Sequence, residues 1–155
     1  MKKFLKKLFA LIANILPKKN IILFESQPDF ADSSKSIFDE CLCNDINRKY
    51  KMVWLVEKPE NFKNADIFNT IFIKKNSKKL SDNIQKLYYF MVAKYCFYTH
   101  NLIGLPGNKR QIRYFIPHAA LPLKNSSGCF WSYQSNTYIE CTSNFAAKYR
   151  CKTFG

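Results

Sequence analysis

The stretch Asn20–Glu57, NIILFESQPDFADSSKSIFDECLCNDINRKYKMVWLVE, predicts the fold of this chain. Its first residues, Asn20–Glu25, form a continuous apolar run, which is typical of a parallel strand covered on both faces. Residues 26–29, SQPD, have the composition of a turn. Apolar residues then keep helical spacing over Ile37–Ile46, and Tyr50–Glu57 reads as a second strand. Strand, helix and strand in this order predict a βαβ unit.

The same alternation continues to the end of the chain. We expect a third strand, a long helix, three further strands and a final helix, with a polar connection before the third strand. In sequence order these are Thr70–Ile73, Ser77–Lys94, Tyr95–Thr99, Ile112–Pro117, Thr137–Thr142 and Asn144–Lys152. This pattern predicts a doubly wound, Rossmann-like parallel sheet of the α/β class over residues 20–155.

The helices carry finer expectations. Asp32 or Ser33 is expected to cap the first helix, and Ser143 the last. The long helix gathers its apolar residues on one side, as an amphipathic helix does. These residues are Leu80, Ile84, Leu87, Tyr88, Met91 and Val92.

Composition limits the classes of function. The 155 residues can bury one sizeable core, and a hydrophobic content of 47% excludes a disordered chain. The formal net charge of +14 attracts anionic partners, which include nucleic acid, acidic lipid headgroups and polyphosphate polymers. Most of the 25 basic residues are lysines, whereas proteins that read nucleic-acid sequence rely on arginine. The lysine-rich usage therefore fits a membrane surface or a generally basic proteome better than a protein that reads nucleic-acid sequence.

Cysteine and glycine usage argue against metal, disulfide and nucleotide-loop chemistry. None of the six cysteines forms a C-x-x-C pair, and their spacing differs from that of zinc sites and disulfide frameworks. We expect reduced, structural cysteines in a cytosolic compartment. The four glycines form no Gly-rich phosphate loop. We expect no cofactor and no metal site.

Residues 1–17, MKKFLKKLFALIANILP, predict a basic amphipathic helix that ends at Pro17. At about 100° per residue, the apolar side chains fall on one half of the helical wheel and the lysines on the other. The apolar run is shorter than the roughly 20 residues that span a bilayer. Such a helix lies in the membrane interface, and Lys18 and Lys19 extend its basic patch toward anionic headgroups.

We therefore expect residues 1–19 to hold the protein peripherally on the cytoplasmic face of the cell membrane. Two alternatives remain open, a signal peptide and an ordinary core helix. Against a signal peptide, lysines interrupt the apolar stretch and no small-x-small cleavage site follows. The residues expected to bind the membrane are Lys2, Lys3, Phe4, Leu5, Lys6, Lys7, Leu8, Phe9 and Ile12.

Polar residues follow three of the expected strands. Because ligands of open parallel α/β sheets bind outside the carboxyl ends of the strands, these residues mark a candidate site. A histidine there can move a proton and a lysine can hold a phosphate. On the pattern alone, structural histidines, loop carboxylates and solvated lysines are the alternative interpretation. The residues are Glu25 at the end of the first strand with Ser26 and Asp29 after it, His100 after the fourth, and His118 and Lys124 after the fifth.

Four segments, in their order and spacing, carry a resemblance to a known family. They are ILFESQPDFADSSKSIFDE at Ile22–Glu40, YKMVWLVEKPENF at Tyr50–Phe62, AKYCFYTHN at Ala93–Asn101 and QIRYFIPHAALPLKNSSG at Gln111–Gly128. Together they resemble the CDP-glycerol glycerophosphotransferases, the polymerases and primases of wall teichoic acid synthesis. The match runs from about residue 20 to the end of the chain.

The last segment carries the chemistry that the resemblance implies. In that family the loop usually reads Trp-His-Gly-x-Pro-Leu-Lys. Here Pro117 stands in place of the tryptophan, Ala119 in place of the glycine, and one extra residue precedes Pro122. His118 aligns with the histidine that acts as catalytic base, and Lys124 would hold a phosphate or stabilise developing charge.

The resemblance also implies a reaction and an architecture. A hydroxyl of the acceptor attacks the glycerol-bearing phosphorus of CDP-glycerol, and CMP leaves. The acceptor is a teichoic acid polymer or its lipid-linked primer, and the transferred unit is glycerol phosphate or a related polyol phosphate. Residues 20–155 resemble the N-terminal, acceptor-side half of a GT-B glycosyltransferase, so we expect that the donor-binding C-terminal domain is absent from this chain. The competing hypotheses are a non-catalytic remnant that binds membrane and polymer, and a basic nucleic-acid-binding domain.

Overall fold

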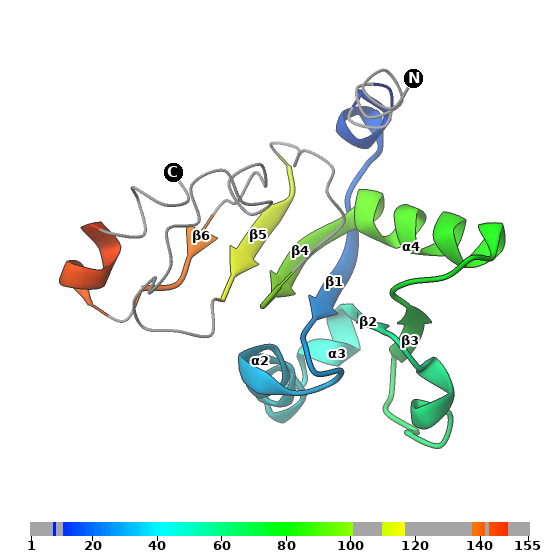
Figure 1. Ribbon diagram of the computed structural model, residues 1–155, viewed down its shortest axis with the longest axis horizontal. Coiled ribbons are helices and arrows are strands. Elements are labelled where there is room, and N and C mark those ends of the chain that lie inside the picture. Colours follow the sequence, from blue (N-terminus) through cyan, green and yellow to red (C-terminus); the bar gives the residue numbers. More distant parts are fainter. Residues whose placement is uncertain (1–7, 9–10, 101–109, 117–137, 142, 149–155) are drawn as a thin grey trace.

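A parallel sheet forms the centre of the protein (Figure 1). The computed structural model describes residues 8, 11–100, 110–116, 138–141 and 143–148. Within these residues six strands lie in the order β3-β2-β1-β4-β5-β6, and every neighbouring pair is parallel. The strands are β1 (Lys19–Glu25), β2 (Lys51–Val56), β3 (Thr70–Lys74), β4 (Ala93–Tyr98), β5 (Ile112–Phe115) and β6 (Tyr138–Ile139). The predicted doubly wound, Rossmann-like α/β sheet is confirmed.

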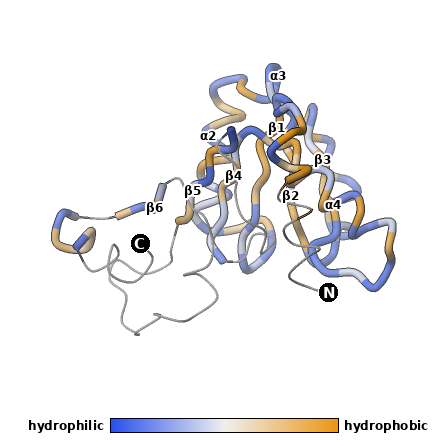
Figure 2. Tube along the Cα trace, turned by 90° about the horizontal axis from the view of Figure 1, so that it is seen from above, coloured by the Kyte–Doolittle hydropathy of each residue, from blue (hydrophilic) through white to orange (hydrophobic). Residues whose placement is uncertain are grey.

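The central strands are buried on both faces, as their continuous apolar runs predict. Successive side chains of β1 point to opposite faces, so Leu23 joins the core beneath α4 (Leu80–Val92), whereas Phe24 joins the core beneath α2 (Asp32–Cys43). β2 divides in the same way, with Val53 and Trp54 in the two cores. Figure 2 shows the hydrophobic colouring along β1 and β2 between the two helical layers.

The core beneath α2 is aromatic. Phe24 stacks on Trp54 with ring centroids 5.1 Å apart and meets Phe38 edge to face at 5.5 Å. Phe97 of β4 stacks on the other side of Phe24 at 5.7 Å. Aromatic pairs at such distances add to the stability that burial of their area provides. This packing fixes α2 over the carboxyl half of β1.

The first helix differs from its predicted form. The expected helical spacing ran on to Ile46, but α2 ends at Cys43 and a separate short helix, α3, spans Ile46–Lys49. Asp45 separates them in the left-handed conformation, with φ of 54°. Aspartate tolerates this conformation better than most residues, and its side chain accepts a hydrogen bond from Arg48 Nε at 2.9 Å. A short 3₁₀ helix, Pro59–Phe62, was not predicted either.

The predicted capping residues are right at one helix and wrong at another. Ala31 occupies the cap position of α2, with no side-chain capping bond, so neither Asp32 nor Ser33 caps this helix. The Asp32 carboxylate instead accepts the adjacent Ser33 N–H at 2.9 Å. Residues 144–148 are helical, and the Ser143 hydroxyl accepts the Ala146 N–H at 3.1 Å, as a cap does.

The predicted apolar side of α4 is only partly buried. Leu80, Ile84 and Tyr88 are 74%, 58% and 39% exposed, whereas Leu87 packs on the core and Phe90 is buried. The core therefore contacts only one edge of the predicted apolar side. Phe90 was missed because it lies beyond that edge, about 60° from Leu87 around the helix axis.

Candidate functional site

The strand order reverses between β1 and β4, and the candidate site lies at the carboxyl ends of these two strands. β1 pairs with β2 on one side and with β4 on the other, although β4 follows much later in the chain. In open α/β sheets such a point is where ligands bind. Glu25 ends β1 and Ser26 follows it here, and Thr99 and His100 follow β4. The structure therefore brings together two of the predicted strand-end clusters.

Glu25 is the fully buried centre of this rim. Its exposed fraction is 0%, and its carboxylate pairs with the ammonium group of Lys75, which follows β3. The second carboxylate oxygen accepts the backbone N–H of His100 at 3.1 Å. The sequence pattern placed Glu25 at the end of the first strand but gave it no role, and it did not identify Lys75. The two lysines at the end of the third strand, Lys74 and Lys75, could have indicated a partner for this carboxylate.

His100 is half-buried and held at the rim by its neighbours. Its backbone is bound by the Glu25 carboxylate, and its ring Nδ1 lies 3.1 Å from the hydroxyl of Thr99. Imidazole can donate or accept a proton near neutral pH and can bind an anion when charged. The geometry thus suits the predicted role of His100 in contacting a phosphate.

Ser26 shapes the loop that follows β1. Its hydroxyl donates to the carbonyl of Pro28 at 2.8 Å and accepts the backbone N–H of Ala31 at 3.2 Å. The residue is buried, with 0% exposed. These contacts form the turn between β1 and α2, and contact with an acceptor phosphate stays a prediction.

Asp29 ties the same loop to the end of β2. Its Oδ2 atom accepts the backbone N–H groups of Glu57 at 2.7 Å and of Lys58 at 3.4 Å. The carboxylate thereby closes the rim over β1 and β2. The described geometry gives Asp29 a structural task, and its predicted part in acceptor binding stays a prediction.

His118 and Lys124, the predicted base and phosphate ligand, lie outside the described residues. The last described residue before them is Ile116, whose N–H donates to the carbonyl of Tyr98 at 2.9 Å. This bond continues the pairing of β5 with β4 toward their carboxyl ends. The described part of β5 therefore leads to the same rim as His100.

The N-terminal helix presents an apolar face to solvent. Among the predicted membrane-binding residues, Leu8 and Ile12 are described, with 40% and 36% exposed. Leu11 and Ile15 on the same helix are 58% and 71% exposed, whereas Ala13 is buried. The other predicted residues, Lys2, Lys3, Phe4, Leu5, Lys6, Lys7 and Phe9, lie outside the described part. Along the described chain, no helix is long and apolar enough to cross a membrane.

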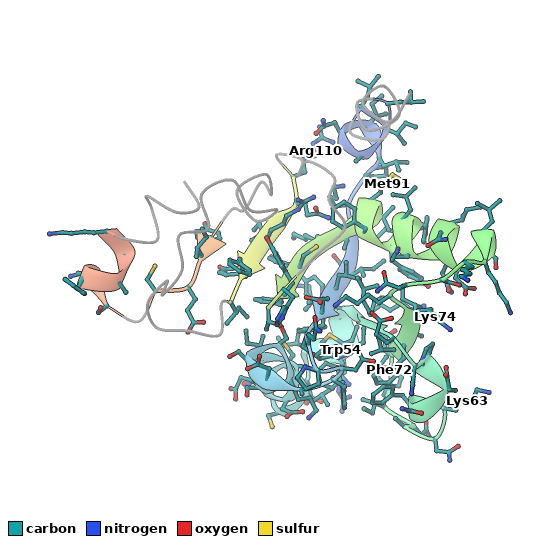
Figure 3. All side chains as sticks on the ribbon, in the orientation of Figure 1. Trp54, Lys63, Phe72, Lys74, Met91 and Arg110 are labelled. Atoms are coloured by element: carbon teal, nitrogen blue, oxygen red, sulfur yellow. The ribbon has the colours of Figure 1, made fainter. Side chains whose placement is uncertain are left out.

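Lys18 does not extend the basic surface as predicted. Its ammonium group donates to the carbonyl of Ala13 at 3.2 Å and to that of Met91 near the end of α4. Burial lowers the pKa of Lys18, and the nearby charges of Arg113 and Arg110 act in the same direction. Lys18 therefore ties the N-terminal helix to α4, and Figure 3 shows Met91 and Arg110 close to the base of that helix.

A buried arginine reinforces the same end of the sheet. The guanidinium group of Arg113 lies 4.6 Å from the ring centre of Phe90, and its Nε donates to the side chain of Gln111 at 2.8 Å. The amide of Gln111 in turn donates to the carbonyls of Phe90 and Ala93 at 2.7 and 3.0 Å. These contacts join β5 to the end of α4 and the start of β4.

Metal ligands do not gather in the described ranges. No group of three or more His, Cys, Asp or Glu side chains there could hold a metal ion. The four cysteines that can be placed, Cys41, Cys43, Cys96 and Cys141, are free thiols. The chemistry that this part of the rim offers is that of a histidine, a lysine, a hydroxyl and two carboxylates.

Comparison with known proteins places this geometry in a family. A solved structure of the wall teichoic acid polymerase TagF is similar at a TM-score of 0.70 and 15% identity, over 96% of this chain and 40% of that chain. The TrkA-N domain of inner membrane protein ybaL from Escherichia coli gives a TM-score of 0.49 at 10% identity, over 88% of this chain and 97% of that chain. No protein of curated function matches the sequence.

The likeness to TagF supports the fold, and the sequence supports the family. The chain spans 40% of the length of the TagF chain that it matches. Residues 8–140, which include the whole sheet, match the family described as CDP-Glycerol:Poly(glycerophosphate) glycerophosphotransferase. This protein belongs to the CDP-glycerol:poly(glycerophosphate) glycerophosphotransferase family.

Proposed function

We propose that this chain is the acceptor-side domain of a transferase that moves glycerol phosphate, or a related polyol phosphate, from CDP-glycerol to a membrane-linked teichoic acid acceptor. The family match over residues 8–140 is the observation that carries the proposal. The rim at the carboxyl ends of β1 and β4 supports it, because His100 lies where ligands of this fold class bind.

In the proposed reaction a terminal hydroxyl of the acceptor attacks the glycerol-bearing phosphorus of CDP-glycerol. The new P–O bond forms as the bond to CMP breaks, and CMP leaves with the electron pair. His118 takes the proton of the attacking hydroxyl. Lys124 stabilises the negative charge that develops on the phosphate oxygens, and His100, Ser26 and Asp29 hold the acceptor.

The donor is held mainly by a second domain outside these 155 residues. This proposal follows the GT-B arrangement, in which the nucleotide sits on the C-terminal half. Titration calorimetry of this chain with CDP-glycerol is expected to give no specific heat. A micromolar dissociation constant would place the donor site within this chain instead.

The membrane partner is proposed to be an anionic bilayer surface on the cytoplasmic side. Leu11 and Ile15 expose apolar side chains on the N-terminal helix, and the sequence around them is rich in lysine. Apolar groups enter the acyl boundary while lysines meet anionic headgroups, which is how interfacial helices bind. Of the alternatives, a core helix fits less well because few of its described side chains, such as Ala13, face the domain.

The membrane helix and the rim lie at opposite ends of β1 (Figure 1). β1 has seven residues, so its ends are about 20 Å apart at 3.3 Å per residue. A membrane-linked acceptor has to reach across this distance to meet the rim at His100. The proposed acceptor is therefore a chain of several repeating units and not a bare lipid headgroup.

A second candidate function is a non-catalytic module that binds membrane and polymer. The departures at Pro117 and Ala119 favour it, because a residue with a Cβ after the histidine restricts the approach of substrate where glycine would not. The two functions predict different results when this chain is joined to a donor-binding domain. A catalytic domain gives activity that depends on His118, and a non-catalytic module gives no such dependence.

Binding to vesicles that carry the acceptor tests the acceptor-side assignment. Two vesicle populations of equal anionic lipid content are compared, one with a lipid-linked poly(glycerol phosphate) chain and one without. Tighter binding to the first population is expected. Equal affinity for both vesicle populations would contradict an acceptor site in this domain. If the protein instead ignores the anionic vesicles and binds added RNA, the nucleic-acid alternative is supported.

A further inference from the structure

Glu25 joins segments that are far apart in the sequence at the rim. It is the last residue of β1, opposite Tyr98 of β4. Its carboxylate accepts the N–H of His100 at 3.1 Å, its backbone carbonyl accepts the N–H of Thr99 at 3.3 Å, and the same carbonyl accepts the hydroxyl of Ser34 at 2.9 Å. The start of the loop after β4 is therefore held from β1.

Lys75 is the ion-pair partner of the buried Glu25 carboxylate. A buried carboxylate is stable only when a partner compensates its charge, and here the exposed side-chain fractions are 13% for Lys75 and 0% for Glu25. The backbone of Lys75 is fixed on both sides, because its N–H donates to Val56 at 2.6 Å and its carbonyl accepts Lys86 Nζ at 2.6 Å. The charge pair therefore has little freedom to move.

We infer that Glu25, paired with Lys75, is a positioning residue that fixes His100 at the rim for contact with a phosphate of the acceptor. The phosphate contact rests on the proposed function, whereas the positioning rests on the hydrogen bond from His100 N–H and on the burial of the pair. Thr99 completes the arrangement, because its hydroxyl lies 3.1 Å from Nδ1 and favours one ring orientation. The carboxylate acts through the backbone of His100 and touches no substrate itself.

A purely structural role is the competing explanation, since the same pair also joins β1, β4 and the segment after β3. Two double variants separate the roles. Glu25→Leu with Lys75→Met replaces both charges by apolar groups of similar size, a change that folded proteins commonly tolerate. Glu25→Gln with Lys75→Met also removes both charges but keeps an oxygen that can accept the N–H of His100.

The experiment follows the ring of His100 by NMR while glycerol phosphate is added. The chain has two histidines, so a His118→Gln background assigns the remaining ring signals to His100. Thermal unfolding of each variant verifies the fold. Asp39→Asn with Lys35→Met is the matched control, because it removes an ion pair between two residues of α2 and leaves Glu25 and Lys75 in place.

In the parent protein the His100 ring signals are expected to take positions set by the contact of Nδ1 with Thr99, and to shift on addition of glycerol phosphate. Glu25→Leu/Lys75→Met is expected to move the ligand-free ring signals and to weaken the affinity for glycerol phosphate about tenfold, because the backbone N–H of His100 loses a hydrogen bond to a charged group. Glu25→Gln/Lys75→Met and the α2 control are expected to keep the ring signals of the parent. If all variants fold and their His100 signals match the parent, the positioning role is wrong.

A different result of the same experiment would contradict the proposed function. A parent protein whose His100 signals never respond to glycerol phosphate contradicts the acceptor-side assignment and the phosphate contact. The positions of the His100 ring signals, and their change in Glu25→Leu/Lys75→Met, are measured without ligand. They decide the positioning by Glu25 whatever the response to glycerol phosphate.

Discussion

The ammonium group of Lys18 is hydrogen-bonded to the carbonyl of Met91, which joins the N-terminal helix to α4. The same group bonds the carbonyl of Ala13, so a single lysine bridges two helices. This contact links the helix with the exposed apolar face to the domain that carries the carboxyl rim.

Replacing Lys18 by methionine is expected to lower the free energy of unfolding by about 1 kcal/mol, the net value of hydrogen bonds from a partly exposed charged group. Lys19→Met is the matched control. Its ammonium group is exposed and bonds the hydroxyl of Tyr88 at 2.6 Å, so a smaller change is expected. Urea denaturation followed by Trp fluorescence measures both. Equal losses for the two variants would show that the bridge from Lys18 adds nothing specific.

Substituting Leu11 and Ile15 by glutamine is expected to weaken binding to anionic vesicles. Each exposed side chain can contribute about 1.5–3 kcal/mol when it enters the membrane boundary, so the pair should cost at least about tenfold in affinity. Vesicle co-sedimentation at rising salt measures this, and the binding that remains should weaken with salt. These substitutions are preferable to deleting residues 1–19, because Lys19 begins β1 and Leu16 packs on the core.

Phe68→Gln is the control for this prediction. Phe68 is 69% exposed, similar to Ile15 at 71%, but it lies in the connection before β3. Unchanged binding is expected for the control. The N-terminal face would not be the membrane contact if Leu11→Gln/Ile15→Gln bound vesicles as tightly as the parent chain.

The thiols of Cys43 and Cys96 are expected to differ in reactivity. Burial raises the pKa of Cys96 to about 12, and its side chain is fully enclosed, whereas Cys43 is exposed. Since the thiolate is the reactive form, iodoacetamide at pH 8 should label Cys43 well before Cys96. Peptide mass spectrometry reads both sites in one sample. Comparable labelling rates would contradict the burial of Cys96.

The same thiol makes stability depend on alkaline pH. The pKa of Cys96 is raised on folding from its ordinary value of 9.0, so the folded state keeps the proton longer than the unfolded chain. The contribution of the protonated Cys96 thiol to the free energy of unfolding is complete below pH 9.0 and is lost as the pH rises toward 12. Cys96→Ala should therefore lose stability less steeply between pH 9.0 and 10 than the parent chain in urea titrations. If Cys96→Ala loses stability more steeply than the parent chain, the pKa of Cys96 is not raised on folding.

Much of the fold follows from local pattern, whereas the rim contacts do not. Strands such as β1 and β2 are continuous apolar runs bounded by polar residues, and these predict a parallel sheet covered on both faces. The pairing of Glu25 with Lys75 joins residues 50 positions apart and depends on β2 lying between β1 and β3. No periodicity in the sequence records such a contact.

The helices show where pattern misleads. The apolar spacing of α4 includes Leu80 and Ile84, yet both are exposed, and the helix meets the core through Leu87 and Phe90. Helical spacing also continues past Cys43, but the left-handed Asp45 breaks the helix there. Both features depend on tertiary packing and on a single backbone conformation, which residue type alone does not determine.

We propose that His118, in the sequence that follows β5, is the catalytic base. The direct measurement is the kcat for CMP release from CDP-glycerol by this chain joined to the donor-binding domain of a related glycerophosphotransferase. His118→Ala should lower kcat by about 10²–10⁴-fold, the usual contribution of a general base. His100→Ala should cost less, and Gln85→Ala on the exposed side of α4 should cost nothing. Full activity in His118→Ala would contradict the role of His118 as the base and make His100 the next candidate.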